Sequence, residues 1–122
     1  MSLEAEESLE VLKECPVDRM ILGSDSPFSY ITKQFACARY LENSTILSQV
    51  VSHQKFSSSF KKDINGEIRN EPLTIKAIVD VLSKLKQVKF DIISKACFRN
   101  SLALLGLETE RYANEVTTGE GA

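Results

Sequence analysis

The sequence contains no tryptophan and only one histidine, His53, among its 122 residues. Catalytic metal sites usually recruit several histidines together with carboxylates, so the chain by itself cannot supply a histidine-rich metal centre. His53 does not follow a predicted strand. We therefore expect it to be a surface residue and not a ligand.

Cysteine is also scarce: Cys15, Cys37 and Cys97 are an odd number with no close pair. A zinc site needs paired cysteines or histidines at short spacing, and a disulfide framework needs a denser, even set. Both are excluded by this pattern. We predict that the three cysteines are reduced and behave as small apolar residues.

Long apolar runs and a basic excess are missing too. No stretch approaches the roughly 18 consecutive apolar residues of a membrane helix, which excludes a membrane partner. The beginning, MSLEAEESLEVLKE, is acidic and amphipathic, which fits neither a secretory signal nor an Arg-rich transit peptide. The default location is the cytoplasm or nucleus. A net charge of −2 argues against binding nucleic acid by bulk charge. The local basic residues are better interpreted as a solvated loop than as a DNA contact; they are Lys55, Lys61, Lys62 and Arg69.

The length allows one domain, and a 43% hydrophobic composition is enough for a core. Residues 2–14 have the pattern of a short amphipathic helix that Pro16 stops. Residues 19–24 form a short apolar run between Pro16 and Ser26-Pro27, typical of a buried strand of a parallel sheet that ends at Asp25.

Helices account for most of the rest. Helical spacing runs from Tyr30 to Leu41, and Asn43-Ser44 is placed to cap another helix. Residues 57–66 read as loop and turn. Asn70-Glu71-Pro72 starts a helix, with Asn70 or Glu71 as the cap and Pro72 in the first turn. The apolar face of that helix comprises Ile75, Ile78, Val79, Leu82 and Leu85. A last helix spans about 90–104 and ends at Gly106, and the polar tail 108–122 is expected to be disordered.

Two motifs in fixed order resemble the C-terminal end of the TatD-type metal-dependent deoxyribonucleases, which are amidohydrolase-like TIM barrels. The first is GSDSPF, at the end of the predicted strand. The second is RNEP, at the start of the closing helices. The resemblance implies an α/β fold class, with residues 1–107 as the C-terminal fragment of a TIM (β/α)8 barrel: mostly helical, with one short parallel-type strand.

The resemblance also implies candidate site residues. Asp25 matches the strand-end aspartate that binds a divalent metal, Mg or Zn, and positions the attacking water in the family. Catalytic groups of a TIM barrel project from the C-terminal ends of its strands. The alternative is that Asp25 only makes hydrogen bonds in the Ser-Pro turn. Arg69, Asn70 and Glu71 either brace the site or touch substrate phosphate, or they form a helix cap, which the local sequence favours.

The chain departs from the family pattern in two ways. Gly23 and Ser24 replace the glutamate and threonine of the motif, and the family's histidine ligands have no counterpart. We therefore expect a fragment, an alternative product or a degenerate relative that binds no metal alone. DNA is the expected substrate of the family, and this chain by itself is expected to be inactive. If it folds alone, it should be a small helical assembly around one strand or none.

Two other interpretations remain. The first is a non-catalytic, mostly helical protein that pairs with itself or a partner through exposed apolar helix faces. The second is a truncated gene product with no independent role.

Overall fold

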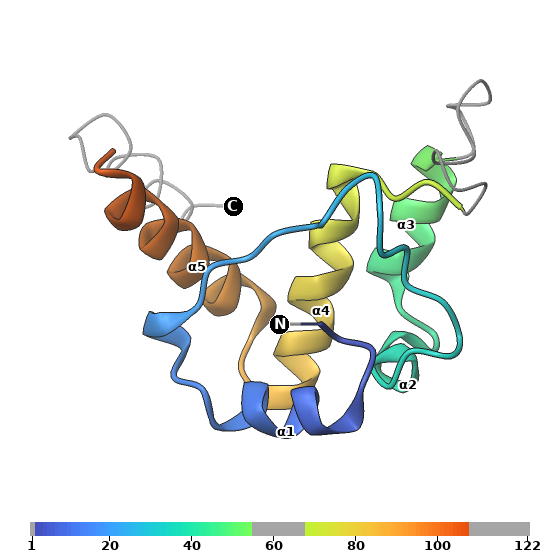
Figure 1. Ribbon diagram of the computed structural model, residues 1–122, viewed down its shortest axis with the longest axis horizontal. Helices are drawn as coiled ribbons and strands as arrows, with labels where there is room; N and C mark the ends of the chain where they lie inside the picture. The colour runs from blue at the N-terminus through green and yellow to red at the C-terminus, as the bar shows by residue number, and fades with distance from the viewer. Residues whose placement is uncertain (1, 55–67, 108–122) are drawn as a thin grey trace.

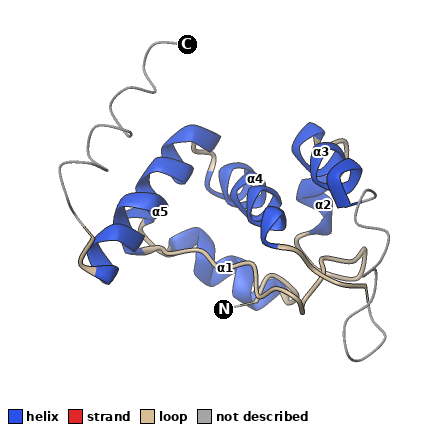
Figure 2. Ribbon diagram, turned by 90° about the horizontal axis from the view of Figure 1, so that it is seen from above, coloured by secondary structure: helices blue, strands red, loops and turns tan. Residues whose placement is uncertain are grey.

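The computed structural model describes residues 2–54 and 68–107, and within these ranges all regular structure is helical (Figure 2). The α-helices are α1 (Glu6–Glu14), α2 (Ala38–Leu41), α3 (Thr45–Gln54), α4 (Ile75–Lys86) and α5 (Phe90–Leu105). There are also two short 3₁₀ turns, η1 (Val17–Arg19) before the extended segment and η2 (Pro72–Thr74) before α4. A mostly helical fold, as the sequence predicts, is therefore confirmed for the described part of the chain.

Helix α4 is the centre of the structure and contacts α1, α2, α3 and α5 (Figure 1). Its buried residues are more widely spread around the helix than a surface helix requires: Ala77, Val79, Val81, Leu82 and Leu85. A helix that is apolar over much of its circumference must be covered on several sides. The neighbouring helices provide that cover.

Helices α1, α2 and α5 each add one or two buried side chains to the core. Leu9 of α1 and Ile93 of α5 are completely buried, and Leu41 of α2 is nearly so. All three cysteines are free; Cys37 and Cys97 belong to the core, and Cys15 is half-buried. The interpretation of these two cysteines as small apolar core residues agrees with their burial.

Polar groups fix the ends of the helices. The Ser44 hydroxyl accepts a hydrogen bond from Leu47 N at 3.0 Å and so caps α3, as predicted. Gly106 ends α5 in the left-handed region at φ 65°, also as predicted. The ammonium group of Lys86 donates to three carbonyl oxygens at the end of α1, those of Leu12, Lys13 and Cys15. This last contact joins α1 to the end of α4.

The predicted strand is wrong for this structure. Arg19 closes η1, and residues 20–24 form an extended connection that crosses α5 and runs to α4 (Figure 1). Met20 has the backbone angles of a strand, φ −99° and ψ 135°. A strand also requires a hydrogen-bonded neighbour. The described part of the chain offers none, so the segment is extended without being paired.

Two predicted helices are shorter than expected. Residues 2–5 do not join α1, because Leu3 O and Glu4 O accept hydrogen bonds from Cys37 N and Ala36 N. Most of residues 30–37 form turns, and only α2 is helical. Tertiary hydrogen bonds overrode a helical spacing at both places.

Several large apolar side chains on the helices are exposed, as the interpretation of unpartnered helix faces predicts. On α5 the exposed fraction is 54% for Ile92, 69% for Leu104 and 66% for Leu105. No helix in the described ranges is both long and apolar enough to cross a membrane.

Candidate functional site

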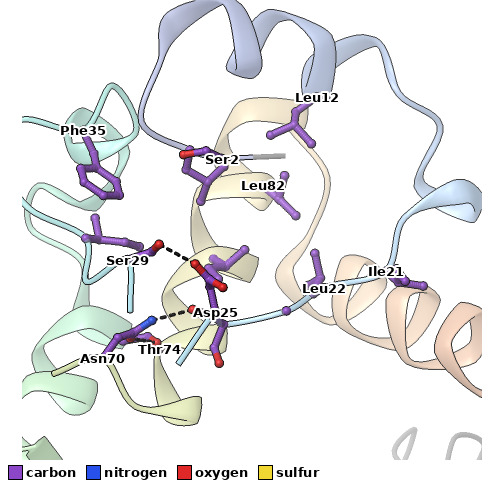
Figure 3. Close-up of a pocket in the computed structure, with 15 residues that line it drawn as sticks. Ser2, Leu12, Ile21, Leu22, Asp25, Ser29, Phe35, Asn70, Thr74 and Leu82 are labelled. Carbon is purple, nitrogen blue, oxygen red and sulfur yellow. Dashed lines mark hydrogen bonds between the residues drawn. The ribbon is translucent and has the colours of Figure 1, made fainter. Parts of the chain in front are cut away.

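Asp25 lies at the end of the extended segment, in a tight turn. Its φ of 59° is in the left-handed region, where aspartate is among the few residues found regularly. Its carbonyl oxygen accepts a hydrogen bond from Phe28 N at 2.9 Å. Its Oδ2 accepts a hydrogen bond from the Ser29 hydroxyl at 2.5 Å (Figure 3). The residue is exposed, and Oδ1 has no hydrogen-bond partner among the described residues, so the turn leaves one carboxylate oxygen available.

Asn70 joins the second motif to this turn. Its side chain is almost fully buried, with 2% of the residue exposed. Its Nδ2 donates to Ser24 O at 2.5 Å, and its backbone N–H donates to Pro27 O at 2.9 Å. Both acceptors flank Asp25 closely in the sequence. The two motifs singled out in the sequence therefore meet in space, and Asn70 is the residue that connects them.

Of the two predicted cap residues, Asn70 and Glu71, the structure places Glu71 at the N-cap position and not Asn70. Glu71 holds the N-cap position of η2 but makes no capping hydrogen bond with its side chain, whereas Pro72 is in the first turn as predicted. The Oδ1 atom of Asn70 faces the Thr74 hydroxyl at 2.5 Å (Figure 3). Because both ends of its amide are engaged in this way, Asn70 braces the Asp25 turn instead of starting the helix.

Arg69 and Glu71 flank Asn70 in the chain but differ in exposure. Arg69 is exposed, and Glu71 is half-buried. Between them, the side chain of Asn70 reaches the segment before Asp25. The other basic candidates, Lys55, Lys61 and Lys62, lie outside the described residues, and so does the side chain of His53.

Asn100 was missed by the sequence reasoning and holds the other end of the extended segment. Its Nδ2 lies 2.9 Å from Val17 O and 2.7 Å from Met20 O, and donates to both. An asparagine inside a helix is a weak helix former that competes for backbone hydrogen bonds. A polar amide within the predicted helix 90–104, on a face whose pattern is otherwise apolar, was the sequence signal for such a hydrogen-bonding role.

A cavity of about 550 Å³ opens beside the segment that ends at Asp25 (Figure 3). One wall is the backbone and side chains of residues 21–25. Facing it are mainly apolar side chains from α1 and the residues before it, from α4, and from the segment before α2: Leu3, Leu12, Ile31, Phe35, Ile78 and Leu82. The polar groups Asn70, Thr74 and Ser29 gather at the Asp25 end. The hollow is thus apolar along most of its length and polar at one end.

The described residues do not fit a metal ion on their own. Within residues 2–54 and 68–107 no cluster of three or more histidine, cysteine, aspartate or glutamate side chains could hold one. Catalytic metal sites generally use three protein ligands. Asp25 contributes one carboxylate to this part of the chain, so a complete ligand set requires groups from elsewhere.

The core thiols are not candidate nucleophiles or ligands. Burial raises the pKa of Cys37 to about 11 and also raises the pKa of Cys97. A reactive cysteine needs an environment that lowers its pKa and exposes the sulfur. These two thiols therefore stay protonated at neutral pH.

Comparison with known proteins identifies related chains. A deoxyribonuclease Tat-D of Schizosaccharomyces pombe is 26% identical over 104 residues, which cover 85% of this chain and 32% of the relative. A putative deoxyribonuclease TATDN1 homolog of Vairimorpha ceranae is 26% identical over 105 residues, covering 86% and 33%. The chain spans about one third of the length of these curated relatives.

Two solved structures and a family model also match this chain. A hydrolase of the TatD family from Entamoeba histolytica matches with a TM-score of 0.60 and 25% identity, over 83% of this chain and 31% of the other. An uncharacterized amidohydrolase from Saccharomyces cerevisiae shares the fold, with a TM-score of 0.58 and 23% identity over 83% and 30%. The model of the family described as "TatD related DNase" matches residues 1–106. This chain therefore belongs to the TatD related DNase family.

Proposed function

We propose that this chain supplies one carboxylate, Asp25, to a TatD-type hydrolase that cleaves DNA phosphodiester bonds with a divalent metal, Mg or Zn. The observation that carries the proposal is the Asp25 turn: an exposed carboxylate with one oxygen unengaged, at the end of an extended segment. Membership of the family supports the position of this residue at the C-terminal end of a barrel strand. The relatives' names supply the substrate class, DNA.

Asn70 has a positioning role in this proposal. It anchors the residue before Asp25 through Ser24 O and the second residue after Asp25 through Pro27 O. Side chains that hold a ligand's backbone in place make a metal site more precise. Arg69 and Glu71 are proposed as further groups that brace the site or face substrate phosphate.

We infer that the chain alone is inactive. One carboxylate cannot organise a catalytic metal, and the described residues hold no cluster that could. The departure from the family motif at Gly23 and Ser24 removes a second carboxylate from the same strand end. The expected location stays the cytoplasm or nucleus.

The first experiment tests the chain by itself. Purified chain is incubated with single-stranded DNA and either Mg²⁺ or Zn²⁺, and metal binding is followed by calorimetry. We expect neither cleavage nor binding of the metal. Cleavage by the wild-type chain that is lost on Asp25→Ala would contradict the inferred inactivity.

The second experiment tests the role of Asp25. In a chimera, this chain replaces the matching third of the Schizosaccharomyces pombe relative, and DNA cleavage is measured with and without Asp25→Ala. We expect the chimera to cleave DNA and the variant to lose that activity. Asp18→Ala removes an exposed carboxylate elsewhere in the same chain; it is the matched control and should retain cleavage. A folded chimera whose cleavage is unaffected by Asp25→Ala would refute the assignment.

A second candidate is a non-catalytic protein that associates through apolar surface. The exposed side chains of Leu104 and Leu105 favour it, since they extend the apolar face of α5 beyond the core. Sedimentation decides between the two: a monodisperse monomer at all concentrations would argue against association.

A further inference from the structure

The cavity beside the Asp25 turn has the size of a small-molecule site. Its volume is about 550 Å³, and pockets that hold small ligands span roughly 300–1,000 Å³. Leu82, which is 1% exposed, and half-buried Leu12 and Ile78 belong to its lining. A molecule that entered the cavity would therefore bury apolar surface against side chains of the core, which favours binding.

The polar end of this cavity carries a negative charge. Among the described residues that line it, Asp25 is charged, and there is no lysine, arginine or histidine. The carboxylate is exposed, and its Oδ1 atom has no hydrogen-bond partner among the described residues. This end therefore attracts a cation and repels an anion such as a carboxylate or a phosphate.

The neighbouring polar side chains have already committed their protons. The Ser29 hydroxyl donates to Asp25 Oδ2 at 2.5 Å. The amide of Asn70 donates to Ser24 O at 2.5 Å, and the Thr74 hydroxyl donates to Asn70 Oδ1 at 2.5 Å. What these side chains still offer a ligand is acceptor capacity, on Asp25 Oδ1 and Ser29 Oγ. An ammonium group, which donates three hydrogen bonds and accepts none, fits that capacity.

A single carboxylate suits an organic cation better than a metal ion. A catalytic metal generally needs three protein ligands, and the described residues form no such cluster. An ammonium group needs one carboxylate and a few further oxygen acceptors, and burial of the attached apolar body adds to its affinity. A cavity that is apolar over most of its length and negative at one end thus selects a molecule with the same division.

We propose that this cavity binds an amphipathic primary amine, a small molecule with an apolar body and one ammonium group. The ammonium group donates to Asp25 Oδ1, and the body lies against Leu12, Ile78 and Leu82 (Figure 3). This site goes beyond the proposed function, since it uses residues of this chain alone and requires neither DNA nor a metal. A metal would need the same carboxylate oxygen, so the two ligands exclude each other at Asp25.

The test compares ligands that differ in charge or in length. Calorimetry on the purified chain at neutral pH, without metal or DNA, measures binding of n-octylamine, n-octanol, octanoate and n-propylamine. We expect saturable binding of one octylamine per chain, and binding of the other three that is at least about tenfold weaker. The alcohol lacks the charge, octanoate has the opposite charge, and propylamine lacks most of the apolar body. Any of the three that binds as tightly as octylamine would overturn the proposal.

A matched pair of variants tests the role of Asp25. Asp25→Asn removes the charge, and asparagine also tolerates the left-handed backbone at φ 59°. It should weaken octylamine binding about tenfold. Asp18→Asn removes the charge of another exposed carboxylate, outside the cavity lining, and should keep the affinity of wild type. Octylamine that binds Asp25→Asn as tightly as wild type would overturn the assignment of the ammonium site.

A second pair separates the cavity from the exposed apolar surface. Ile78→Phe enlarges a half-buried side chain of the lining and should weaken octylamine binding about tenfold by filling the cavity. Leu105→Ser changes an exposed apolar residue of α5 outside the lining and should leave binding unchanged. Nuclear Overhauser contacts between the octyl chain and the methyl groups of Ile78 and Leu82 in the wild-type chain give a readout that needs no variant. Octylamine that contacts neither residue, or that is lost on Leu105→Ser, would overturn the cavity site.

The two proposals that involve Asp25 can fail separately. If the chain binds octylamine through Asp25 but the folded chimera does not cleave DNA, the proposed function is refuted and the amine site stands. If the chimera loses cleavage on Asp25→Ala but the chain binds no octylamine, the amine site is refuted and the proposed function stands.

Discussion

The amide of Asn70 donates to the carbonyl oxygen of Ser24, the residue before Asp25, although 46 positions separate the two in the chain. The bond is 2.5 Å long, and Asn70 is 2% exposed. It joins the start of η2 to the end of the extended segment. This hydrogen bond connects the two motifs, and substitution of Asn70 tests its contribution to stability.

Replacing Asn70 with alanine should destabilise the chain by about 2 kcal/mol, because a part-buried carbonyl loses its donor and the Thr74 hydroxyl loses an acceptor. Asn70→Asp should cost at least as much at neutral pH, since a carboxylate cannot donate to Ser24 O. Urea unfolding followed by far-UV circular dichroism measures both. Gln34→Ala, at an exposed amide side chain, is the control and should change stability by less than about 0.5 kcal/mol. An Asn70→Ala variant as stable as this control would contradict the bracing role.

The loss of stability on substituting Asn100 should depend on whether the new side chain is apolar or negatively charged. Its Nδ2 donates to two carbonyl oxygens, those of Val17 and Met20. Asn100→Ala leaves both without this donor and should cost about 1–3 kcal/mol. Asn100→Asp places a carboxylate against two carbonyl oxygens and should cost more than the alanine variant. Thermal unfolding of the two variants gives the order, and the reverse order would show that the amide is not the donor.

Lys86 should stabilise the packing of α1 on α4. Its ammonium group donates to three carbonyl oxygens at the end of α1, at 2.6–3.0 Å, where positive charge also complements the helix dipole. Lys86→Met keeps the apolar stem, removes the donors and should cost about 2 kcal/mol. Lys76→Met changes an exposed lysine of the same helix and should be close to neutral. Denaturant titration of both variants distinguishes the bridge from a general loss of charge.

Local patterns predicted the closing helices well. The spacing of Ile75, Val79 and Leu82 identified α4, and Pro72 and Gly106 marked a beginning and an end within a residue or two of those observed. These signals are local: periodic apolar residues select a helix, and fixed or permissive backbone angles end it. No distant partner is needed to interpret them.

The extended segment shows where such reasoning stops. The apolar run 19–24 correctly indicated extended backbone from Met20 onward, but strand formation depends on a neighbouring strand that the described residues lack. The expected role of Asn70 as a helix cap differs from the structure for a related reason. A cap was visible in the local sequence, whereas the acceptor the side chain uses, Ser24 O, lies far away in the chain.

Burial of Cys37 makes the free energy of unfolding depend on pH in the alkaline range. It is completely buried, and burial raises the pKa of its thiol to about 11 from an ordinary value of 9.0. The unfolded chain therefore releases this proton first as pH rises, so the stabilisation is complete below about pH 9 and is lost progressively toward pH 11. The unfolding free energy of wild type should fall through this window more steeply than that of Cys37→Ala. Alkylation followed by mass spectrometry provides a second readout: near neutral pH, half-buried Cys15 should react before Cys37. Rapid modification of Cys37 in the folded chain would contradict its place in the core.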